Sequence, residues 1–428
     1  MYFIYNILLS ITSILLSPLI LFALLREEKY RMGLSQKLGF LPPHLLLKLS
    51  GSRPVWIHAV SVGEVTSTIP LIQEIKKRYP SQKIILSTVT VTGNYTATIR
   101  VREVDAVIYF PLDYPFIVKK VIRQIKPKLF IILETELWPN ILRELKRNNI
   151  PSVVVSGRIS NRSYHKYRWG RFFFTKVLDN IHLFCMQTEV DSKRIINIGA
   201  DKDRVTTVGN LKFDQCVPTI TTEEKENLYN MLSLKEGQTI FIAGSTHKGE
   251  ENIVLEVFKN LKKTYEDLIL ILAPRHPERF DEVADLISHQ KLRSIKKTKI
   301  KVAQKSNHHD IILLDTIGEL SKLYSIGTII FVGGSLVSTG GHNVLEPVAY
   351  KKAVIFGPHM DNFSEISRCL RESGGGFQVN NQEEFLSQTE MLLQNDVDRD
   401  KLGEKAFEVI AHNQGAINKS MEAIKRFL

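Results

Sequence analysis

Cysteine is scarce in this chain of 428 residues, and the motifs that would use it for metal binding are absent. The three cysteines, Cys185, Cys216 and Cys369, lie far apart among apolar neighbours, and no CxxC pair occurs. An odd number of scattered cysteines favours a reducing compartment and packed thiols over a disulfide framework. The sequence also has no HExxH motif and no Cys/His cluster, so we predict no structural metal.

Three other features are missing: a GxxxxGK[ST] motif, a low-complexity tract and an internal repeat. Without the first, a P-loop hydrolase is disfavoured. Without the second, disorder is disfavoured, and a hydrophobic content of 43% is ample for burial. The chain is too long for one ordinary core, so we expect two domains.

Charged side chains are missing from residues 2–25, YFIYNILLSITSILLSPLILFALL. As a helix this segment would reach about 36 Å, enough to cross a hydrocarbon core of about 30 Å. No positive charge precedes it and no A-x-A site closes it, which disfavours a cleaved signal peptide. Pro18 and several hydroxyl residues keep open a helix that lies in the membrane interface. Four basic residues that follow place the rest of the chain in the cytoplasm by the positive-inside rule: Arg26, Lys29, Arg31 and Lys37.

Positive charge, by contrast, is abundant. The chain has 57 Lys and Arg against 45 Asp and Glu, a net charge of +12. The excess is concentrated between Lys119 and Arg171, where thirteen basic residues face three glutamates. Such a surface suits nucleic acid, anionic lipid or an acidic substrate, and composition alone leaves the three open.

The first half of the chain alternates short apolar segments with helical ones. The helices expected between them include Val65–Tyr79, Pro115–Ile125 and Trp138–Asn148. This alternation predicts a doubly wound parallel sheet. The expected strands are 54–60, 83–89, 106–110, 128–133, 151–155, 182–186 and 205–208.

A second series of strands follows a looser stretch and predicts a second Rossmann-like domain. The expected strands are 239–243, 268–273, 299–303, 311–314, 328–332, 353–356 and 376–379. The fold class is therefore α/β, with two Rossmann-like domains facing a cleft and ligands beyond the carboxyl ends of the strands. The expected organisation is a membrane-anchor helix at 1–25, a juxtamembrane basic linker at 26–53, an N-terminal domain at 54–213, an interdomain linker at 214–238, a C-terminal domain at 239–397 and a helix at 398–428 that could cross back to the N-terminal domain.

The densest glycine motif, FVGGSLVSTGGHNVLEPVAYKKAVIFGP, spans residues 331–358. Its glycines let backbone amides approach a ligand, and a helix expected near Asn343 would add a phosphate seat. Glu346, about one turn into that helix, could accept from ribose or base groups. The alternative is a tight strand-to-helix connection without a ligand. The glycines are Gly333, Gly334, Gly340 and Gly341.

Two more strand ends carry groups suited to a nucleotide. LAPRHPER (272–279) ends a strand with Pro274, Arg275 and His276, and the Arg275 guanidinium can bind phosphate with two parallel hydrogen bonds. DTIGEL (315–320) closes another strand with Gly318 at the turn. If these strands are neighbours, the three strand ends would form one nucleotide site.

In the first half, the segment VWIHAVSVGEVTST (55–68) places Glu64 where an expected strand ends and a helix begins. A carboxylate there can cap the helix, bind a metal or act as a general base. Glu134 and Glu136 follow another buried strand, and Lys212 follows the last strand of the domain. Together they could supply a base and a cation that neutralises developing negative charge.

These motifs together resemble one family. SVGE after an apolar N-terminal segment, ETELWPN, GNLKFD, GSTHKGEE, APRHPER and FVGGSL…GGHNVLEP occur in order over nearly the whole chain. The set resembles the 3-deoxy-D-manno-octulosonic acid (Kdo) transferases, inverting enzymes of lipopolysaccharide assembly with the GT-B fold. The resemblance implies transfer of Kdo from CMP-Kdo to the lipid A precursor, lipid IVA, at the cytoplasmic face of the bacterial inner membrane.

The resemblance also implies residue roles. Glu64 would be the general base, and Glu134 and Lys212 would stabilise the transition state. No cofactor and no metal is expected, since CMP-Kdo is a donor substrate whose leaving group is already activated. The CMP contacts would fall on Pro274, Arg275, Ile317, Gly318, Glu319, Asn343, Val344, Leu345 and Glu346.

The partners expected on this basis are CMP-Kdo, lipid IVA and anionic inner-membrane lipids, and not nucleic acid. The segment RSYHKYRWGRFFF (162–174) interleaves cations with aromatics, as a surface in the headgroup layer would, or as an ordinary helix with one packed face. Three alternatives remain: a GT-B enzyme with a UDP-sugar donor, a membrane-tethered nucleic-acid-binding protein, and a non-catalytic lipid-binding clamshell.

Overall fold

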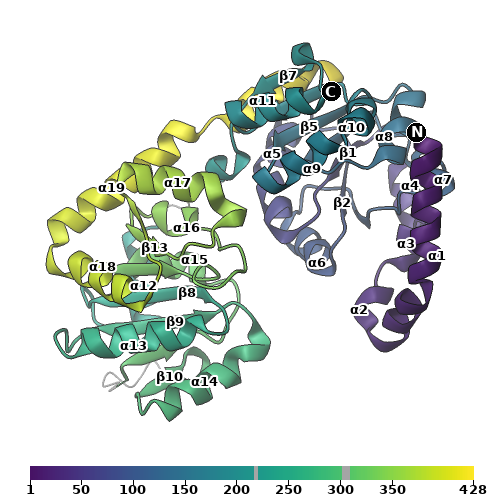
Figure 1. Ribbon diagram of the computed structural model, residues 1–428. Coiled ribbons are helices and arrows are strands. Elements are labelled where there is room, and N and C mark those ends of the chain that lie inside the picture. The colour runs from purple at the N-terminus through teal and green to yellow at the C-terminus, as the bar shows by residue number, and fades with distance from the viewer. Residues whose placement is uncertain (216–219, 301–308) are drawn as a thin grey trace. The chain divides into compact units, whose positions relative to one another are not determined.

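The computed structural model describes residues 1–215, 220–300 and 309–428, which form two compact units (Figure 1). Unit 1 comprises Met1–Gln215 and Asn413–Leu428, and unit 2 comprises Cys216–His412. Each unit is built around a seven-stranded sheet in which every strand pair is parallel. The predicted α/β class with two parallel sheets is confirmed.

The sheet of unit 1 has the order β3-β2-β1-β4-β5-β6-β7. The direction of winding reverses between β1 and β4, so a crevice opens beyond the carboxyl ends of these two strands. All seven predicted strands are present. Their bounds are β1 Val55–His58, β2 Ile84–Thr88, β3 Ala106–Tyr109, β4 Leu129–Leu133, β5 Ser152–Gly157, β6 Leu183–Met186 and β7 Val205–Thr207.

Helices cover both faces of this sheet. The helix predicted at Pro115–Ile125 has those bounds, whereas the one predicted from Val65 begins at Val62. The α-helices are α5 Val62–Arg78, α6 Val91–Arg100, α7 Pro115–Ile125, α8 Pro139–Arg147, α9 Asn161–Trp169, α10 Arg171–Leu178, α11 Glu189–Ile198 and α20 Ala416–Ile424. The short 3-10 helices are η1 Lys202–Arg204, η2 Leu211–Asp214 and η7 Lys425–Phe427.

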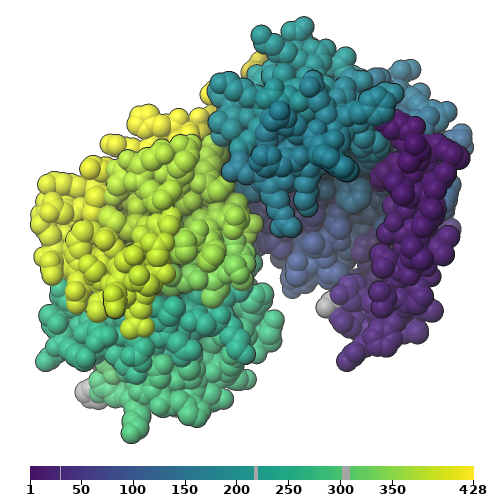
Figure 2. All heavy atoms as spheres, viewed as in Figure 1, coloured from purple at the N-terminus to yellow at the C-terminus, as the bar shows by residue number. Residues whose placement is uncertain are grey.

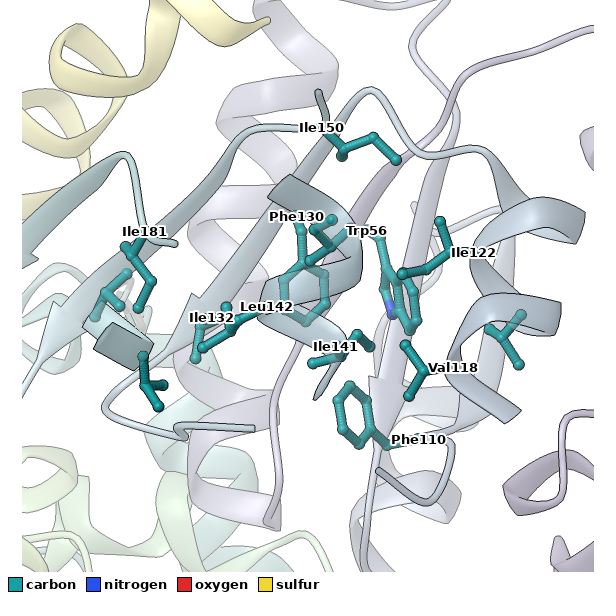
Figure 3. Close-up of a cluster of buried hydrophobic side chains, with 14 of the residues drawn as sticks. Trp56, Phe110, Val118, Ile122, Phe130, Ile132, Ile141, Leu142, Ile150 and Ile181 are labelled. Carbon is teal, nitrogen blue, oxygen red and sulfur yellow. The ribbon is translucent and has the colours of Figure 1, made fainter. Parts of the chain in front are cut away.

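Alternating side chains of the buried strands build two cores, one on each face of the sheet. Trp56 of β1 points to one face, where it meets Phe130 edge-on at a ring distance of 4.9 Å and side chains of α7 and α8 (Figure 3). Its neighbours Val55 and Ile57 belong to the cluster on the other face. All three are fully buried, and burial of a large apolar side chain contributes about 1.5–3 kcal/mol.

The N-terminal segment is helical and part of unit 1. Residues 26–53, expected as a linker, pack on the edge of the sheet, where the Gln36 side chain accepts from the Tyr109 N–H at 2.8 Å. Gly33 has φ +67°, and a Cβ there would lie 2.0 Å from the Tyr109 ring, so a glycine is required. The helices are α1 Tyr2–Arg26, α2 Glu28–Arg31, α3 Leu34–Lys37 and α4 Pro43–Leu49.

The sheet of unit 2 has the order β10-β11-β9-β8-β12-β13-β14 and reverses between β8 and β12. Six of the seven predicted strands are present, but the strand predicted at 299–303 is wrong in position. The edge strand lies at Ser294–Lys296, Lys297–Lys299 form a 3-10 turn, and residues 301–303 lie outside the described residues. The strands are β8 Ile240–Thr246, β9 Ile269–Pro274, β10 Ser294–Lys296, β11 Ile311–Leu313, β12 Ile329–Val332, β13 Val354–Phe356 and β14 Gly376–Gln378.

The stretch 214–238, expected as a linker, contains a capped helix in its described part. In α12 the Thr221 side chain and Glu224 form a capping box. The α-helices of unit 2 are α12 Thr222–Met231, α13 Glu250–Lys262, α14 Phe280–His289, α15 Leu320–Leu323, α16 Leu345–Val348, α17 Ser364–Ser373, α18 Gln382–Gln394 and α19 Asp396–Asn413. Its 3-10 helices are η3 Pro277–Arg279, η4 Lys297–Lys299, η5 Tyr324–Ile326 and η6 Asp361–Phe363.

The C-terminal segment is two helices, not one. Helix α19 ends at Asn413 and α20 begins at Ala416, and Gly415 between them has a φ of +98°, which suits glycine. The Asp214 carboxylate accepts from the N–H groups of Gly415 and Ile417, both at 2.6 Å, and so caps the start of α20. Met421 and Ile424 of α20 complete a core cluster of unit 1.

Candidate active site

Unit 1 places its predicted catalytic residues at the reversal point of its sheet. Glu64 lies in the first turn of α5, directly after β1, and Glu134 directly follows the neighbouring strand β4. Lys212 lies in η2, after β7. The strand order brings Glu64 and Glu134 together. Lys212 follows the edge strand β7, and η2, which contacts α5, places its side chain beside Glu134.

Glu64 is partly buried at the start of its helix. Its carboxylate accepts from the Val60 N–H at 2.8 Å and from the Ser61 hydroxyl at 3.1 Å. Burial and the charge of Glu134, with a smaller effect of Glu136, raise the pKa of Glu64 to about 7 against the opposing effect of these hydrogen bonds. A carboxyl with this pKa is suited to accept a proton near neutral pH.

Lys212 and Glu134 form an ion pair at this edge, with 3.3 Å between Nζ and Oε1. Lys212 is buried, at 9% exposure, and the Asn210 side chain fixes its backbone by accepting from its N–H at 3.0 Å. Glu134 has φ +55°, a backbone conformation that costs free energy for a residue other than glycine. Strained conformations of this kind are often found at functional sites. Burial and the charge of Glu134 raise the pKa of Glu136 as well.

This arrangement can accept a proton and stabilise negative charge at one place. Glu64 provides the acceptor, and the Lys212 ammonium provides a nearby positive charge next to Glu134. Over residues 1–215, 220–300 and 309–428, no group of three or more His, Cys, Asp or Glu is placed to hold a metal ion.

In unit 2 the reversal point is organised by Glu250, a residue to which the sequence analysis gave no role. Its carboxylate is fully buried and accepts four backbone N–H groups, from His247 at 2.8 Å and from Gly334, Ser335 and Leu336 at 2.7, 2.9 and 2.9 Å. Burial raises the pKa of Glu250, and these four hydrogen bonds oppose the rise. The GSTHKGEE motif, which spans the end of β8 and the start of α13, was the available indication.

These bonds correct the prediction that the amides of the first glycine pair form a phosphate-binding site. The amides of Gly334, Ser335 and Leu336 are engaged by Glu250, and the Gly341 N–H donates to Gly334 O at 2.7 Å. Gly333 is required for close packing, since a Cβ there would lie 2.7 Å from Ser245 O. The first glycine pair therefore holds the loop onto Glu250 and does not offer its amides to a ligand.

The predicted helix near Asn343 is a single turn, α16, that begins at Leu345. Glu346 is therefore its second residue, earlier in the helix than predicted. Asn343 accepts from the Leu345 N–H at 3.1 Å and donates to the Glu346 carboxylate at 3.2 Å. Val344 and Leu345 are buried, so only their backbone groups could reach a ligand.

The other predicted CMP contacts lie at neighbouring strand ends. Pro274 ends β9, and the exposed Arg275 follows, while Ile317, Gly318 and Glu319 follow the adjacent strand β11. Strand β8 separates β9 from β12, so β11, β9, β8 and β12 form one continuous edge. Lys297 donates to Glu319 at 2.9 Å, and the bonds from Thr316 and Lys297 outweigh burial and lower the pKa of Glu319.

Two further histidines lie at this edge, His247 and His342, and the sequence analysis gave neither a role. His247 and His342 are stacked and joined between their Nε2 atoms at 2.8 Å, and His276 lies edge-on to His247. Burial and the charge of Arg275 lower the pKa of His342 to about 3, and burial lowers the pKa of His247. The pair is thus neutral at pH 7, and one ring donates to the other. The only local indication of this pair was one histidine in each of the GSTHKGEE and GGHN segments.

Comparison with known proteins shows the family of this chain. Residues 32–215 match the family model "3-Deoxy-D-manno-octulosonic-acid transferase (kdotransferase)". A 3-deoxy-D-manno-octulosonic acid transferase of Haemophilus influenzae is 36% identical over 97% of this chain and 98% of its own. One of Rickettsia felis is 30% identical over 87% of this chain and 79% of its own.

Among solved structures, UDP-GlcNAc 2-epimerase from Neisseria meningitidis, bound to UDP-GlcNAc, aligns over 87% of this chain and 100% of its own with a TM-score of 0.59. At 13% identity this likeness concerns the fold alone. Two parallel seven-stranded α/β units of this kind define the GT-B class of fold. Within that class, the chain belongs to the Kdo transferase family of glycosyltransferases.

Proposed function

We propose that this protein transfers Kdo from CMP-Kdo to a hydroxyl group of lipid IVA with inversion at the anomeric carbon. Glu64 takes the proton of the acceptor hydroxyl as its oxygen attacks that carbon. The bond between the carbon and the phosphate oxygen breaks, its electron pair stays with the phosphate, and CMP leaves. The donor, acceptor and membrane location are those expected of the family.

The observation that carries the proposal is the environment of Glu64. Its raised pKa, to about 7, suits a base near neutral pH, and the Lys212–Glu134 pair lies at the same strand edge. A base that accepts a proton in the transition state contributes about 10²–10⁴ in rate. Attack from the face opposite to CMP gives inversion in a single displacement.

On the donor side, unit 2 contributes positive charge mainly through Arg275. This side chain is exposed beyond the end of β9, and an Arg can bind phosphate with two parallel hydrogen bonds. The segment from Asn343 to Glu346 offers further polar groups along the same strand edge. With this charge in place, we expect transfer without a divalent metal, so a chelator should leave the rate unchanged.

Two features support a membrane-bound acceptor. The described residues include one helix, Tyr2–Arg26, that is long and apolar enough to cross a membrane. The basic stretch between Lys119 and Arg171 suits a phosphorylated lipid and anionic headgroups. Family membership favours this enzyme over a nucleic-acid-binding protein or a non-catalytic clamshell.

The test is transfer from CMP-Kdo to lipid IVA by the full-length protein, with UDP-GlcNAc as competing donor. We expect a product heavier by one or more Kdo residues, release of CMP, and no incorporation from UDP-GlcNAc. Transfer from UDP-GlcNAc alone would replace the donor assignment with the UDP-sugar alternative. Transfer from CMP-Kdo to an acceptor other than lipid IVA would overturn the acceptor assignment only.

A further inference from the structure

Helix α1 has one polar stripe, and that stripe is docked on unit 1. Tyr2, Tyr5, Asn6 and Ser13 recur at helical spacing and are partly buried, as are only a few other residues of α1. Figure 1 shows α1 along the flank of unit 1 with its N-terminal end beside α8. The polar side chains of Tyr2, Tyr5, Asn6 and Ser13 therefore face protein, whereas Ser10, Thr12 and Ser17 are exposed.

The contacts of the stripe reach three elements of the α/β unit. Tyr5 donates to the Asp113 carboxylate at 3.1 Å, and Asn6 accepts from the Asn140 amide of α8 at 2.7 Å. Asn180 donates to the Tyr2 hydroxyl at 2.7 Å.

Two ring contacts and one more hydrogen bond also join α1 to unit 1. Arg143 of α8 lies over the Tyr2 ring at 4.6 Å, and Tyr5 packs on Phe173 of α10 at a ring distance of 5.8 Å. Ser13 bonds Tyr114 at the start of α7.

Asp113 connects these contacts of α1 to the core of unit 1. The same carboxylate accepts the N–H groups of Asn140 and Ile141, both at 2.9 Å, and so caps the first turn of α8. Burial raises the pKa of Asp113 to about 6, with the three hydrogen bonds opposing the rise. The position of Tyr5 is thus fixed by a group that also fixes a core helix.

The rest of α1 lies at the surface of unit 1 (Figure 2), and its exposed side chains are apolar except for Ser10, Thr12, Ser17 and Arg26. An uncovered apolar surface of this length is unfavourable in water and favourable in lipid. Its large exposed side chains are Phe3, Ile4, Ile7, Leu8, Ile11, Ile14, Leu15, Leu16, Leu19, Ile20, Leu21, Phe22 and Leu25.

Two exposed phenylalanines lie next to residues that α1 contacts. Phe116 stacks near Tyr114, the partner of Ser13, at a ring distance of 5.8 Å and is 71% exposed. Phe172, next to Phe173, is 77% exposed, and the Lys176 ammonium lies over its ring at 5.0 Å. Exposed Phe side chains next to Lys are typical of segments that lie in the membrane interface.

These contacts conflict with a spanning helix. If α1 crossed the bilayer with the chain after Arg26 in the cytoplasm, its first turn would lie about 30 Å from that side. Tyr2, Tyr5 and Asn6 could not then reach Asn180, Asp113 and Asn140 of the cytoplasmic unit. The docked geometry requires both ends of α1 on the same side of the hydrocarbon core.

We propose that α1 is a monotopic anchor that lies in the cytoplasmic leaflet as a fixed part of unit 1, with its polar stripe on the protein and its apolar face in the acyl chains. The proposal rests on the membrane location given under the proposed function. It places unit 1, with Glu64, at a fixed height and orientation on the bilayer.

A disulfide pair tests the dock in native membranes of a Gram-negative host that expresses the full chain. Asn6→Cys with Asn140→Cys should crosslink under mild oxidation, detected as a disulfide-linked peptide by mass spectrometry. The matched control, Ile7→Cys with Asn140→Cys, moves the thiol to the exposed side of the same turn and should not crosslink. Equal crosslinking of the two pairs would contradict the docked helix. So would the absence of crosslinking in both pairs while the protein is present in the membrane.

A labelling experiment tests the topology without the substitution at Asn140. Phe3→Cys should remain unlabelled by a membrane-impermeant maleimide in intact spheroplasts, while Cys369 of unit 2 should react only after permeabilisation. Labelling of Phe3→Cys in intact spheroplasts would establish a spanning helix and overturn the proposal. Recovery of the protein in the soluble fraction would overturn it as well. Neither readout depends on Kdo transfer, so failure of the proposed reaction would be seen separately.

Discussion

The Glu64 carboxylate accepts a 2.8 Å hydrogen bond from the N–H of Val60, the residue two positions before its helix begins. This bond makes Glu64 a structural group at the helix N-terminus, and a cap of this kind usually lowers a carboxyl pKa. Burial and the charge of Glu134 have the larger effect here, so the pKa rises to about 7. The capping and the basic role suggested by the sequence are thus compatible in one side chain.

Replacing Glu64 with Gln separates these two roles. The amide oxygen can still accept from Val60, but it does not take up a proton at neutral pH. We expect Kdo transfer to fall by about 10²–10⁴ with unchanged CMP affinity, measured by initial rates and by CMP titration. Glu74→Gln, on the same helix and paired with Arg78, is the control and should transfer normally. A rate of Glu64→Gln close to the wild-type rate would return Glu64 to a capping role alone.

The pH dependence of transfer reports the environment of Glu64 directly. A base works when deprotonated, so the rate should rise with pH and reach half its plateau near pH 7. The charge of Glu134 raises this pKa, so Glu134→Gln should shift the midpoint to lower pH. The measurement is kcat against pH for both proteins at saturating substrates. A midpoint that stays at the same pH in Glu134→Gln would show that the two carboxyl groups are not coupled.

Lys212 should contribute charge and not only packing. Lys212→Met keeps the length of the side chain but leaves the Glu134 carboxylate without its partner at 3.3 Å. We expect a loss of about 10²–10³ in kcat, the usual cost of removing one stabilising group from a developing anion. Lys212→Arg should recover part of the activity, which a purely structural loss would not predict, and thermal unfolding of both variants serves as the folding control.

The sequence predicted much of this architecture because strand and helix patterns are local. Thirteen of the fourteen strands could be located from short apolar runs between turns. The edge strand β10 was missed because Ser294–Lys296 contains one apolar residue, and the more apolar IKVA that follows attracted the prediction. An edge strand has one neighbour, so its sequence is less constrained by burial.

The geometry of the site was less predictable, because it depends on which acceptor each backbone N–H group binds. The glycines at 333–334 were predicted to form a phosphate-binding loop, but the buried carboxylate of Glu250, 84 residues before Gly334 in the sequence, already accepts from the N–H groups of Gly334, Ser335 and Leu336. Nothing in a local pattern reports such a long-range bond. The polar stripe of α1 was likewise hidden, because Tyr2, Asn6 and Ser13 read as interruptions of an apolar helix until their partners were known.

Arg275 should control donor affinity more than the chemical step. Its guanidinium is exposed beyond β9, where a phosphate can be bound in a fork. We expect Arg275→Ala to weaken CMP binding by about tenfold or more, on the order of 1.5–3 kcal/mol for a charged hydrogen bond, measured by calorimetry. Lys248→Ala, which removes an exposed cation near the same edge, should bind CMP as the wild type does. Equal affinities of the two variants would place the phosphate elsewhere.

Glu250 should stabilise unit 2 and the loop after β12 without touching the substrate. One carboxylate oxygen of Glu250 accepts from Ser335 and Leu336, and the other accepts from His247 and Gly334. In Glu250→Gln one of these oxygens becomes an NH₂ group, which cannot accept, so two of the four buried N–H groups lose their partner. We expect a loss of about 1–3 kcal/mol in the free energy of unfolding and weaker CMP binding, with kcat at saturating CMP-Kdo little changed. Glu256→Gln, on the exposed face of the same helix α13, is the matched control and should unfold as the wild type does. Retained stability in Glu250→Gln would mean that a second group can accept these amides, and a selective loss of kcat would mean that Glu250 acts on the reaction itself.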